Sequence, residues 1–355
     1  MTDIRLDAAQ DLRVGEELPI EALNAYLQAQ LPNFGGITKV GQFGGGYSNL
    51  TYQIQTSSKA YVLRRPPFGA KDIQKGHDMG REYRILSTLR NAGYSKVPQA
   101  ILYCEDETIL GSPFYLMEKI DGVILRGKMA TKINIPEAEM GQLSRSLIDA
   151  LVDLHRIDIE ATGLIQLGKP EGYIQRQVEG WGKRYAAAQT DEIPQMQELA
   201  KWLQAKLPTE CQATLIHNDF KYDNAILAPQ SLEIIALLDW EMSTVGDPLM
   251  DLGTCLSYWC EAGDGDFEKN FNVSWLPGNL TRREVAAYYA EKSGRDISNV
   301  LYFYVFGLFK NAVIMQQIYS RYKKGYTKDE RFALLIWGVQ ELAKKAVQAL
   351  DDGKI

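Results

Sequence analysis

This chain of 355 residues has few of the side chains from which covalent or metal-bound frameworks are built. It contains four cysteines and three histidines. The cysteines form no C-x-x-C pair, which excludes a disulfide-rich framework, and so few histidines exclude a histidine-rich metal site. We therefore expect reduced, mostly buried thiols in a cytoplasmic protein.

Long hydrophobic runs and an excess of positive charge are also missing. The most apolar helical stretch, residues 300–318, is interrupted by Gly307, Lys310 and Asn311, which indicates a buried helix that falls short of a membrane span. The first residues contain no apolar core of a secretory signal. A net charge of −6 argues against non-specific nucleic-acid binding. We expect neither a nucleic acid nor a membrane as a partner.

The composition is otherwise that of an ordinary globular protein with a sizeable core. Hydrophobic residues make up 45% of the chain and charged residues 24%. The first 18 or so residues are polar and predict an arm. Apolar residues at helical spacing then predict a helix over residues 19–31.

The hydrophobic pattern next changes its period from helix to strand. From residue 37, a strand, a glycine turn, a strand, a polar turn and a strand follow in order, which predicts an antiparallel meander. One helix and two more strands complete this part of the chain. The predicted strands are residues 37–43, 50–55, 60–65, 100–104 and 113–120, and the predicted helix is residues 78–92.

Beyond residue 120 the pattern is mainly helical, with short β-like pieces among the helices. The predicted helices are residues 137–157, 172–188, 193–207, 282–294, 298–325 and 328–353. We therefore predict an α+β fold in three parts. These are an N-terminal arm and helix at 1–36, a five-stranded antiparallel lobe with one helix at 37–120, and a helical lobe at 121–355.

Three consecutive glycines, Gly44, Gly45 and Gly46, lie in the first turn of the meander, and Ser48 and Asn49 follow them. Glycines allow positive φ and bring backbone N–H groups close to an anion such as phosphate. An ordinary hairpin turn explains the same residues equally well. The turn is therefore a candidate phosphate-binding loop only in combination with other signals.

The most informative polar loop lies between two short apolar runs and spans residues 217–224. A third apolar run, further along the chain, ends at Asp239. The spacing His217-x-Asp219-x4-Asn224, followed by Asp239, is that of a phosphoryl-transfer catalytic loop and the metal-binding aspartate after it.

Together with Gly-Asp-Pro-Leu-Met-Asp-Leu at residues 246–252, this spacing resembles the aminoglycoside phosphotransferase family of kinase-like enzymes, to which choline kinase-like proteins are related. The resemblance covers nearly the whole chain. It implies a bilobal, protein-kinase-like fold with ATP or GTP and Mg²⁺ as cofactors. It also implies transfer of the γ-phosphoryl group to a hydroxyl of a small molecule, by a monomer or a homodimer.

The resemblance assigns chemical roles to the loop. Asp219 would accept the proton of the acceptor hydroxyl or orient that hydroxyl, and Lys221 could reach the transferred phosphoryl group. Asn224 and Asp239 offer the hard oxygen ligands that Mg²⁺ prefers. A polar turn with an Asx cap would be the better interpretation if Asp219 and Asn224 stood alone.

Other residues of these segments are expected to be structural. Histidine has an unperturbed pKa near neutrality, so His217 could be a general base. The resemblance instead implies that it packs behind the loop and orients the aspartate. Asp247 should cap the helix that follows it, and Asp251 should brace the backbone of the loop. We expect His77 and His155 to be incidental.

Arg64 stands where the third strand of protein kinases carries the lysine that pairs with nucleotide phosphates. A guanidinium can hold phosphate and carboxylate together, although arginine and lysine are not interchangeable. Glu82 in the following helix is its expected partner, whereas Arg65 should point to the other face and be solvated. By resemblance, backbone groups of Glu118 and Ile120 would receive the adenine of the nucleotide.

Two segments, residues 172–181 and the aromatic run 302–310, resemble the kinase-like domain attached to certain acyl-CoA dehydrogenases. The substrates implied by that resemblance are hydroxylated acyl chains, such as a hydroxyacyl-CoA or a hydroxy acid. A buried helix is the better explanation of the aromatic run from its periodicity alone. The candidates for an acceptor pocket are Tyr173, Gln177, Trp181 and Tyr304.

Two other interpretations stay open. A kinase of aminoglycoside-type antibiotics or amino alcohols should gather carboxylates for a cationic acceptor. Glu261, Asp264, Asp266 and Glu268 do cluster, but the glycines among them predict a solvated loop. A nucleotide-binding pseudokinase without transfer activity is the alternative of another class, and Arg64 in place of lysine is its support.

Overall fold

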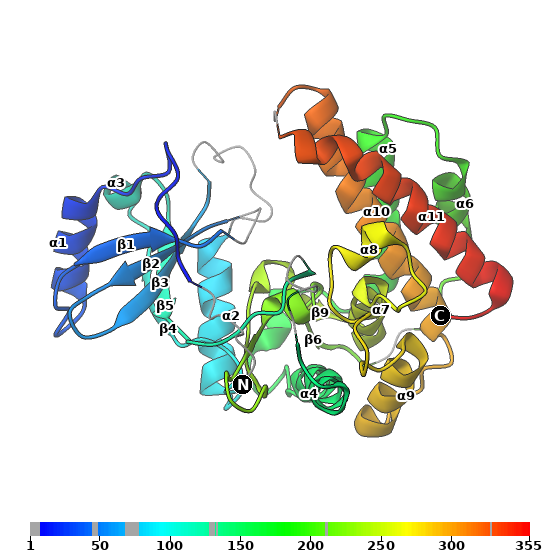
Figure 1. Ribbon diagram of the computed structural model, residues 1–355, viewed down its shortest axis with the longest axis horizontal. Helices are drawn as coiled ribbons and strands as arrows, with labels where there is room; N and C mark the ends of the chain where they lie inside the picture. The colour runs from blue at the N-terminus through cyan, green and yellow to red at the C-terminus, as the bar shows by residue number, and fades with distance from the viewer. Residues whose placement is uncertain are drawn as a thin grey trace. The chain divides into compact units, whose positions relative to one another are not determined.

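The structure, a computed structural model, describes residues 8–44, 49–67, 78–127, 132, 134–209, 212–326 and 329–355. The chain divides into two compact units. Of the described residues, the sheet unit contains those up to Ile124 together with Ala225–Met242, and the helical unit contains Leu125–Asn224 and Ser243–Ile355 (Figure 1). Residues 225–242, which the sequence assigns to the helical lobe, therefore pack with the sheet.

The sheet unit is built on five antiparallel strands in the order β1-β2-β3-β5-β4. They are β1 (Lys39–Gln42), β2 (Leu50–Gln55), β3 (Ala60–Arg65), β4 (Ala100–Cys104) and β5 (Phe114–Glu118). In β2 the side chains alternate between buried and half-buried, as expected for a strand with one face on the core. The predicted five-stranded antiparallel sheet is confirmed.

Three helices accompany this sheet: α1 (Ile20–Gln30), α2 (Met79–Asn91) and α3 (Glu107–Leu110). Asp78 caps α2 by accepting the backbone N–H of Arg81, and the helix packs against β4 and β5 (Figure 1). The short α3 was not expected. Asp106 caps it in the same way, by accepting the backbone N–H of Thr108.

Short strands and turns surround the loop identified in the sequence. In the helical unit, β6 (Thr214–Ile216) pairs with β9 (Thr244–Gly246), which the sequence did not predict, and the turn η4 (Tyr222–Asn224) forms the end of the loop. In the sheet unit, β7 (Ala225–Leu227) pairs with β8 (Ile234–Leu237). The turn η5 (Trp240–Met242) then follows directly after Asp239.

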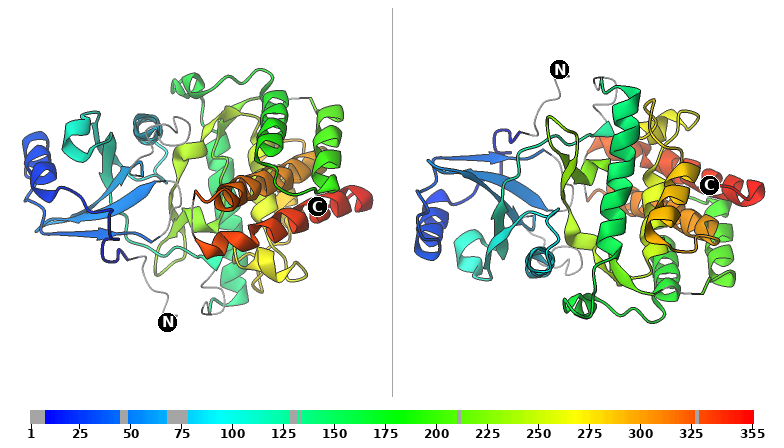
Figure 2. Two further views of the ribbon diagram at one scale, coloured as in Figure 1. Left: turned by 90° about the horizontal axis from the view of Figure 1, so that it is seen from above. Right: turned by 90° about the horizontal axis from the view of Figure 1, so that it is seen from below.

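The core of the helical unit is α10 (Val300–Lys323), which packs against α5 (Tyr173–Ala188), α6 (Pro194–Ala205), α7 (Pro248–Tyr258) and α11 (Leu335–Asp352), as Figure 2 shows. The other helical segments are α4 (Glu137–His155), η3 (Leu164–Leu167), α8 (Asp266–Lys269), α9 (Arg282–Ser293) and η6 (Glu330–Leu334). The predicted helix 328–353 is thus divided into η6 and α11. Within the described part of the chain, no helix has the length and apolarity that crossing a bilayer requires.

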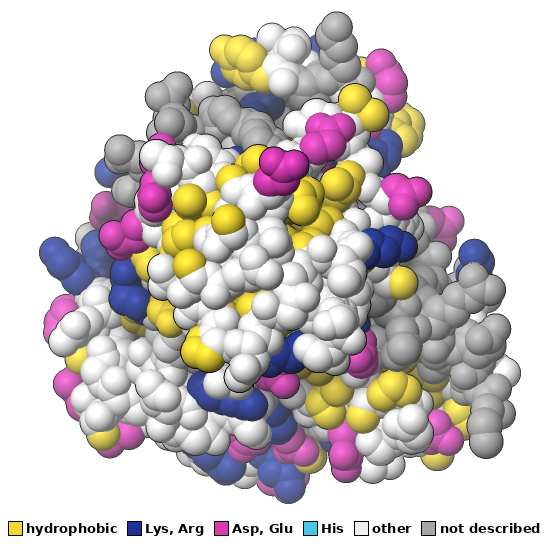
Figure 3. Space-filling model, turned by 90° about the vertical axis from the view of Figure 1, so that its left-hand side faces the viewer, with side chains coloured by type: hydrophobic (Ala, Val, Ile, Leu, Met, Phe, Trp, Pro, Cys, Tyr) yellow, Lys and Arg dark blue, Asp and Glu magenta, His cyan; other side chains and the backbone are white. Residues whose placement is uncertain are grey.

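The surface shows no extended area of one charge sign on the face drawn in Figure 3. Lysine and arginine side chains alternate there with aspartate and glutamate, and hydrophobic side chains lie between them. An electrostatic field that attracts nucleic acid requires positive charge concentrated on one face, and the face in Figure 3 carries both signs of charge.

Two glycines set the distance between α7 and α10. A Cβ atom on Gly253 would lie 2.2 Å from the backbone oxygen of Phe303, and one on Gly307 would lie 2.4 Å from the backbone oxygen of Gly253. Real Cβ atoms do not approach backbone atoms so closely, so the two helices can touch only because both residues lack a side chain. This close contact positions Asp251 on α7 and Lys310 on α10.

We expect Gly253→Ala to destabilise the protein by about 1–3 kcal/mol, because the added methyl group forces the two helices apart. Denaturant unfolding measures the change. Gly263→Ala is the control, since a Cβ atom there meets nothing within 4 Å, and it should change the stability by less than about 0.5 kcal/mol. Equal stabilities of the two variants would contradict the packing argument.

Candidate active site

The loop after β6 is held by one buried carboxylate from the first turn of α7. Asp251 accepts the backbone N–H of His217 at 2.6 Å and that of Asn218 at 2.7 Å. Asn218 has a φ of +65°, a conformation that asparagine tolerates better than most residues do. Burial disfavours the charge of Asp251, but hydrogen bonds outweigh burial and lower its pKa.

A histidine that was expected to be incidental completes this bracing. His155, at the end of α4, is buried, and its Nε2 lies 3.2 Å from Oδ2 of Asp251. Its Nδ1 lies 2.8 Å from the hydroxyl of Tyr289 on α9. The partners of His155 are 96 and 134 residues further along the chain, so no local pattern could have indicated its role. His77 lies outside the described residues.

His217 and Asp247 also hold backbone. The His217 ring is fully buried, its Nδ1 accepts the backbone N–H of Asp219 at 3.3 Å, and it meets Phe220 edge to face. Asp247 caps α7 by accepting the backbone N–H of Leu249 at 2.8 Å. The histidine therefore contacts the backbone of the aspartate that it precedes.

Asp219 is surrounded by donors. Lys221 Nζ lies 3.0 Å from both of its carboxylate oxygens. The amide nitrogen of Asn224 donates to Oδ2 of Asp219 at 2.7 Å and to its backbone oxygen at 2.8 Å. Tyr258, at the end of α7, adds a ring whose centre lies 4.6 Å from Lys221 Nζ, a contact that the sequence did not indicate. Burial opposes the charges of this pair, yet their attraction lowers the pKa of Asp219 and raises that of Lys221.

The neighbouring Asp223 is different. Its Oδ1 is buried and makes no hydrogen bond among the described residues. Burial raises the pKa of Asp223 to about 6. A buried carboxylate oxygen without a donor is costly, and a cation is one way to satisfy it.

In the sheet unit, Arg64 at the end of β3 faces three carboxylates. Its Nε lies 3.4 Å from Glu82, and its Nη2 lies 3.1 Å from Asp239 and 3.8 Å from Glu241. Burial acts against the charge of Arg64, but the three carboxylates raise its pKa well above the ordinary value. The expected pairing of Arg64 with Glu82 is present, and two further carboxylates join it.

Glu82 and Asn49 tie this cluster to the rest of the sheet unit. Glu82 accepts the hydroxyl of Tyr115 at 2.9 Å and the side-chain amide of Asn49 at 3.1 Å. The same amide donates to Glu241 at 2.9 Å. Burial raises the pKa of Glu82, although Arg64 acts in the opposite direction. Asn49, predicted to contact the cofactor, is thus a cross-link between two carboxylates.

Asp239 has a backbone conformation that suggests a special position. Its φ is +66°, and its side chain is 29% exposed, more than those of its neighbours in the cluster. Non-glycine residues at such φ angles store strain and concentrate at functional sites. Within the described residues, no group of three or more histidine, cysteine, aspartate and glutamate side chains forms a metal-ligand set.

The other residues predicted to bind the cofactor belong to the glycine turn or to the end of β5. Gly44 is open, with nothing within 4 Å of where a Cβ would be, whereas Gly45, Gly46 and Ser48 lie outside the described residues. The backbone N–H of Glu118 donates to Gln99 at 2.9 Å. Ile120 packs against a small core cluster formed by Ile124, Ile226 and Ala236.

Arg65 corrects one expectation. It is 1% exposed, where we expected a solvated side chain. Its Nη1 donates to the backbone oxygen of Leu110 at 2.8 Å, and its Nε donates to that of Pro66 at 3.2 Å. The unpredicted helix α3 ends at Leu110 and thus provides the acceptor.

Of the acceptor-pocket candidates, two contact the loop or its supports. The hydroxyl of Tyr173 accepts the side-chain amide of Asn218 at 3.2 Å, and the Trp181 ring lies 6.0 Å from Lys310 Nζ. Gln177 is half-buried on α5. The centre of the Tyr304 ring lies 5.7 Å from the guanidinium carbon of Arg282.

The acidic cluster at residues 261–268 is another correction. The sequence predicted a solvated loop, but Arg282 lies 3.1 Å from Glu261 and 2.6 Å from Asp264. Lys345 lies 2.9 Å from Asp264 and 2.6 Å from Glu268. Asp266 is the member that is exposed. The other three are partly buried because α9 and α11 bring cations to them.

The geometry of both units can be compared with that of known proteins. A family model described as the phosphotransferase enzyme family, APH, matches residues 39–288. This chain belongs to that family. The predicted family membership is confirmed.

Relatives and solved structures agree with this assignment. Acyl-CoA dehydrogenase family member 11 of Rattus norvegicus is 36% identical over 337 residues, which are 93% of this chain and 43% of the relative. The chain thus spans less than half the length of that relative. The expected kinship with domains attached to acyl-CoA dehydrogenases is confirmed.

The fold is shared with solved structures over nearly their full lengths. A protein of Ralstonia eutropha JMP134, provisionally assigned as an aminoglycoside phosphotransferase, is 28% identical with a TM-score of 0.80, covering 95% of this chain and 99% of that one. Spectinomycin phosphotransferase, solved with ADP and spectinomycin, is 15% identical with a TM-score of 0.56, covering 92% and 98%. Choline kinases share the fold as well. The predicted kinase-like α+β fold is confirmed.

The role of Asp251 predicts an acid-dependent stability. Its folded pKa lies below the usual 3.8, so its stabilisation is complete above about pH 4 and is lost as the pH falls through the folded pKa. Asp251→Asn should lower the unfolding free energy at pH 7 by about 1–3 kcal/mol and weaken the loss on acidification.

Denaturant unfolding between pH 7 and pH 3 measures both effects. Asp266→Asn is the matched control, because Asp266 is exposed in the same unit and should leave the pH profile unchanged. A wild-type pH profile in Asp251→Asn would show that its carboxylate does not hold the loop.

Proposed function

We propose that this chain transfers the γ-phosphoryl group of ATP, or of GTP, to a hydroxyl of a small molecule. Membership of the phosphotransferase family and the kinase-like fold support the reaction class. The observation that carries the proposal is the arrangement around Asp219. Its ionised carboxylate is held by Lys221 and Asn224 in a loop whose backbone is fixed from behind.

The proposed step is a direct displacement. The acceptor oxygen forms a bond to the γ-phosphorus, the bond from that phosphorus to the bridging oxygen breaks, and the nucleoside diphosphate leaves with the electron pair. The proton of the acceptor hydroxyl passes to the carboxylate of Asp219. Because the pKa of Asp219 is lowered, we expect it to orient the hydroxyl first and to take the proton late, as the new bond forms.

Lys221 has a different task in this proposal. The attraction of Asp219 raises its pKa, so the ammonium stays charged at neutral pH. A fixed positive charge beside the acceptor would stabilise the negative charge that spreads over the transferred phosphoryl group. The same ammonium fixes the rotamer of Asp219.

The residues of both units fit a nucleotide with Mg²⁺. Arg64 is one cation among three carboxylates, so carboxylates outnumber cations in this cluster. In the helical unit Asn224 uses its amide nitrogen on Asp219, so its oxygen can serve a cation, and the buried Oδ1 of Asp223 lies one residue away. We propose Asn224 and Asp239 as the ligands. Bound Mg²⁺ would neutralise phosphate charge.

For the acceptor we favour a hydroxyacyl-CoA or a hydroxy acid. The support is the 36% identity over 93% of this chain to a relative named as an acyl-CoA dehydrogenase family member. An aminoglycoside-type antibiotic or an amino alcohol is the alternative, because spectinomycin phosphotransferase and choline kinases share the fold. Phosphate release or nucleotide consumption with Mg²⁺ and each acceptor class distinguishes the two.

Asp219→Ala should lower kcat by about 10²–10⁴-fold, because the hydroxyl loses the group that orients and deprotonates it. Nucleotide binding, measured by calorimetry, should persist. Asp191→Ala is the control, since Asp191 is an exposed residue of the same unit whose loss should leave kcat unchanged. Full turnover in Asp219→Ala would contradict the mechanism.

A pseudokinase is the alternative of another class, and Arg64 is the residue that tests it. Arg64→Lys keeps the charge but cannot reach Glu82 and Asp239 together, so we expect a higher KM for the nucleotide and a kcat within about tenfold of wild type. Wild-type protein that binds nucleotide with Mg²⁺ but transfers phosphate to none of the acceptor classes would favour the pseudokinase.

A further inference from the structure

Lys310 is a buried charge in the middle of α10. Its side chain comes from a helix whose neighbouring residues are mostly apolar, and the residue is 2% exposed. Its Nζ donates to the backbone oxygen of Asn218 at 2.6 Å. Because Asn218 directly precedes Asp219, the ammonium lies beside the peptide group that joins these two residues. The sequence showed this lysine only as an interruption of an apolar run.

The ammonium has more donors than partners. Lysine carries three N–H donors, and among the described residues the Asn218 carbonyl accepts the single hydrogen bond of Lys310. The ring of Trp181, 6.0 Å away, offers a further but weaker contact. Two donors of a buried cation without acceptors are unfavourable, and an acceptor oxygen from a ligand would satisfy them.

The electrostatic setting supports a functional role for this charge. Burial lowers the pKa of Lys310 to about 8, although Asp219 and Asp251 act in the opposite direction. The ammonium is therefore charged at neutral pH at a cost to folding, and that cost is relieved only as the pH rises from 8 towards the usual 10.5. Ionisable groups with a perturbed pKa are more common at functional sites than elsewhere.

The carboxylates near Lys310, Asp219 and Asp251, already have other partners, and two cations lie near it as well. Lys221 and Arg184 both repel it. The guanidinium of Arg184 lies 4.5 Å from the centre of the Trp181 ring, and Lys310 lies 6.0 Å from the same ring. Aromatic rings and cations suit an acceptor that carries oxygen atoms and negative charge.

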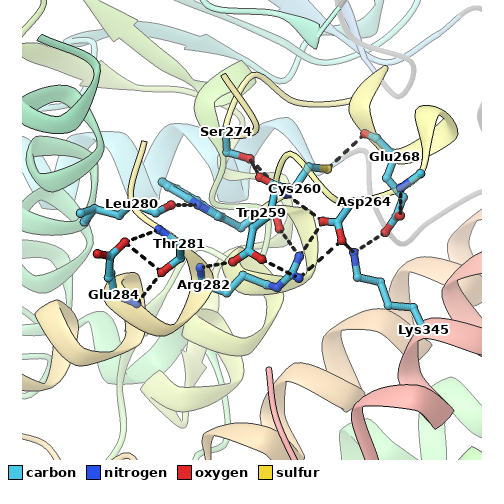
Figure 4. Close-up of polar contacts among 12 residues, drawn as sticks. Trp259, Cys260, Asp264, Glu268, Ser274, Leu280, Thr281, Arg282, Glu284 and Lys345 are labelled. Carbon is cyan, nitrogen blue, oxygen red and sulfur yellow. Dashed lines mark hydrogen bonds and ion pairs between the residues drawn. The ribbon is translucent and has the colours of Figure 1, made fainter. Parts of the chain in front are cut away.

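Three of the four carboxylates that could hold a polycationic acceptor are already paired. Figure 4 shows Asp264 between Arg282 and Lys345, and Glu268 beside Lys345. Glu261 also binds Arg282. This ion-pair network leaves Asp266 as the exposed carboxylate of the four, so most of the acidic segment is no longer available to hold amino groups.

We infer that Lys310 determines acceptor specificity by donating to a carbonyl or carboxylate oxygen of the acceptor, which is a hydroxy acid or its thioester and not a polycation. The inference rests on the proposed function, because it places the acceptor next to Asp219. The shared chemistry of the two acceptor forms is an oxygen that accepts hydrogen bonds at a fixed distance from the hydroxyl. Lys310 thereby selects which hydroxyl is presented.

The test uses Lys310→Met, which keeps the length and removes the charge, and Lys310→Gln, which keeps one donor group. Lys206→Met is the control, since Lys206 is exposed in the same unit. Thermal unfolding checks that each variant folds. Calorimetry with a non-hydrolysable ATP analogue then measures binding of medium-chain hydroxy acids, their coenzyme A thioesters, the matching diols and kanamycin.

We expect wild type and Lys206→Met to bind the acid or the thioester about 10- to 100-fold more tightly than the diol, and Lys310→Met to lose this preference with an unchanged or higher melting temperature. Tighter binding of the acid identifies a carboxylate as the partner of Lys310, and tighter binding of the thioester identifies a carbonyl. Lys310→Gln should recover part of the preference.

Three results would overturn the inference: an unchanged preference in Lys310→Met, preferential binding of kanamycin by wild type, or no binding of acid or thioester by wild type. Turnover assays separate this failure from that of the proposed function. Transfer to an acceptor that does not depend on Lys310 would retain the function and overturn the inference. Binding that depends on Lys310 but is followed by no phosphate transfer would retain the inference and overturn the proposed function.

Discussion

The helical unit depends on one buried carboxylate that has no chemical part in the proposed reaction. Asp251 accepts two successive backbone N–H groups of the loop and lies beside the buried His155. Moving the loop would leave two amides and a buried charge without partners, at a cost of about 1–3 kcal/mol for each group. The orientation of Asp219 is therefore set before any substrate binds, which is how electrostatic catalysis avoids reorganisation during the reaction.

The two units differ in the balance of cations and carboxylates at their candidate functional residues. In the sheet unit, Arg64 is outnumbered by carboxylates, so that unit is suited to a nucleotide that arrives with a divalent cation. In the helical unit, Asp219 is paired with Lys221, and the further cation Lys310 donates to the backbone of the same loop. A hydroxyl acceptor that also carries an oxygen anion or carbonyl matches this second arrangement. Three of the four carboxylates of the acidic segment near α8, which could have favoured a polycation, are paired with cations within the fold.

Predictions from the sequence succeeded where the signal was local and failed where a partner lay far along the chain. Strand alternation and the Asp247-Pro248 start of α7 both depend on a few neighbouring residues, and the structure contains each of them. We expected Arg65 to be solvated because the residues next to it in sequence do not indicate its acceptor, the backbone oxygen of Leu110, which lies 45 residues away. The acidic segment was misjudged for the same reason, since its cations come from α9 and α11.

The sequence by itself determined the fold class, the family and the spacing of the loop, because these depend on periodicity and on residues within one short segment. Only the tertiary structure decided which charges are paired beyond the predicted pair of Arg64 and Glu82. Arg64 meets Asp239 across 175 residues, and Lys310 reaches Asn218 across 92. Such pairings follow from how helices and strands pack, and packing is set by many weak contacts at once. The contacts proposed to bind the acceptor, such as those of Lys310, therefore depended on the tertiary structure.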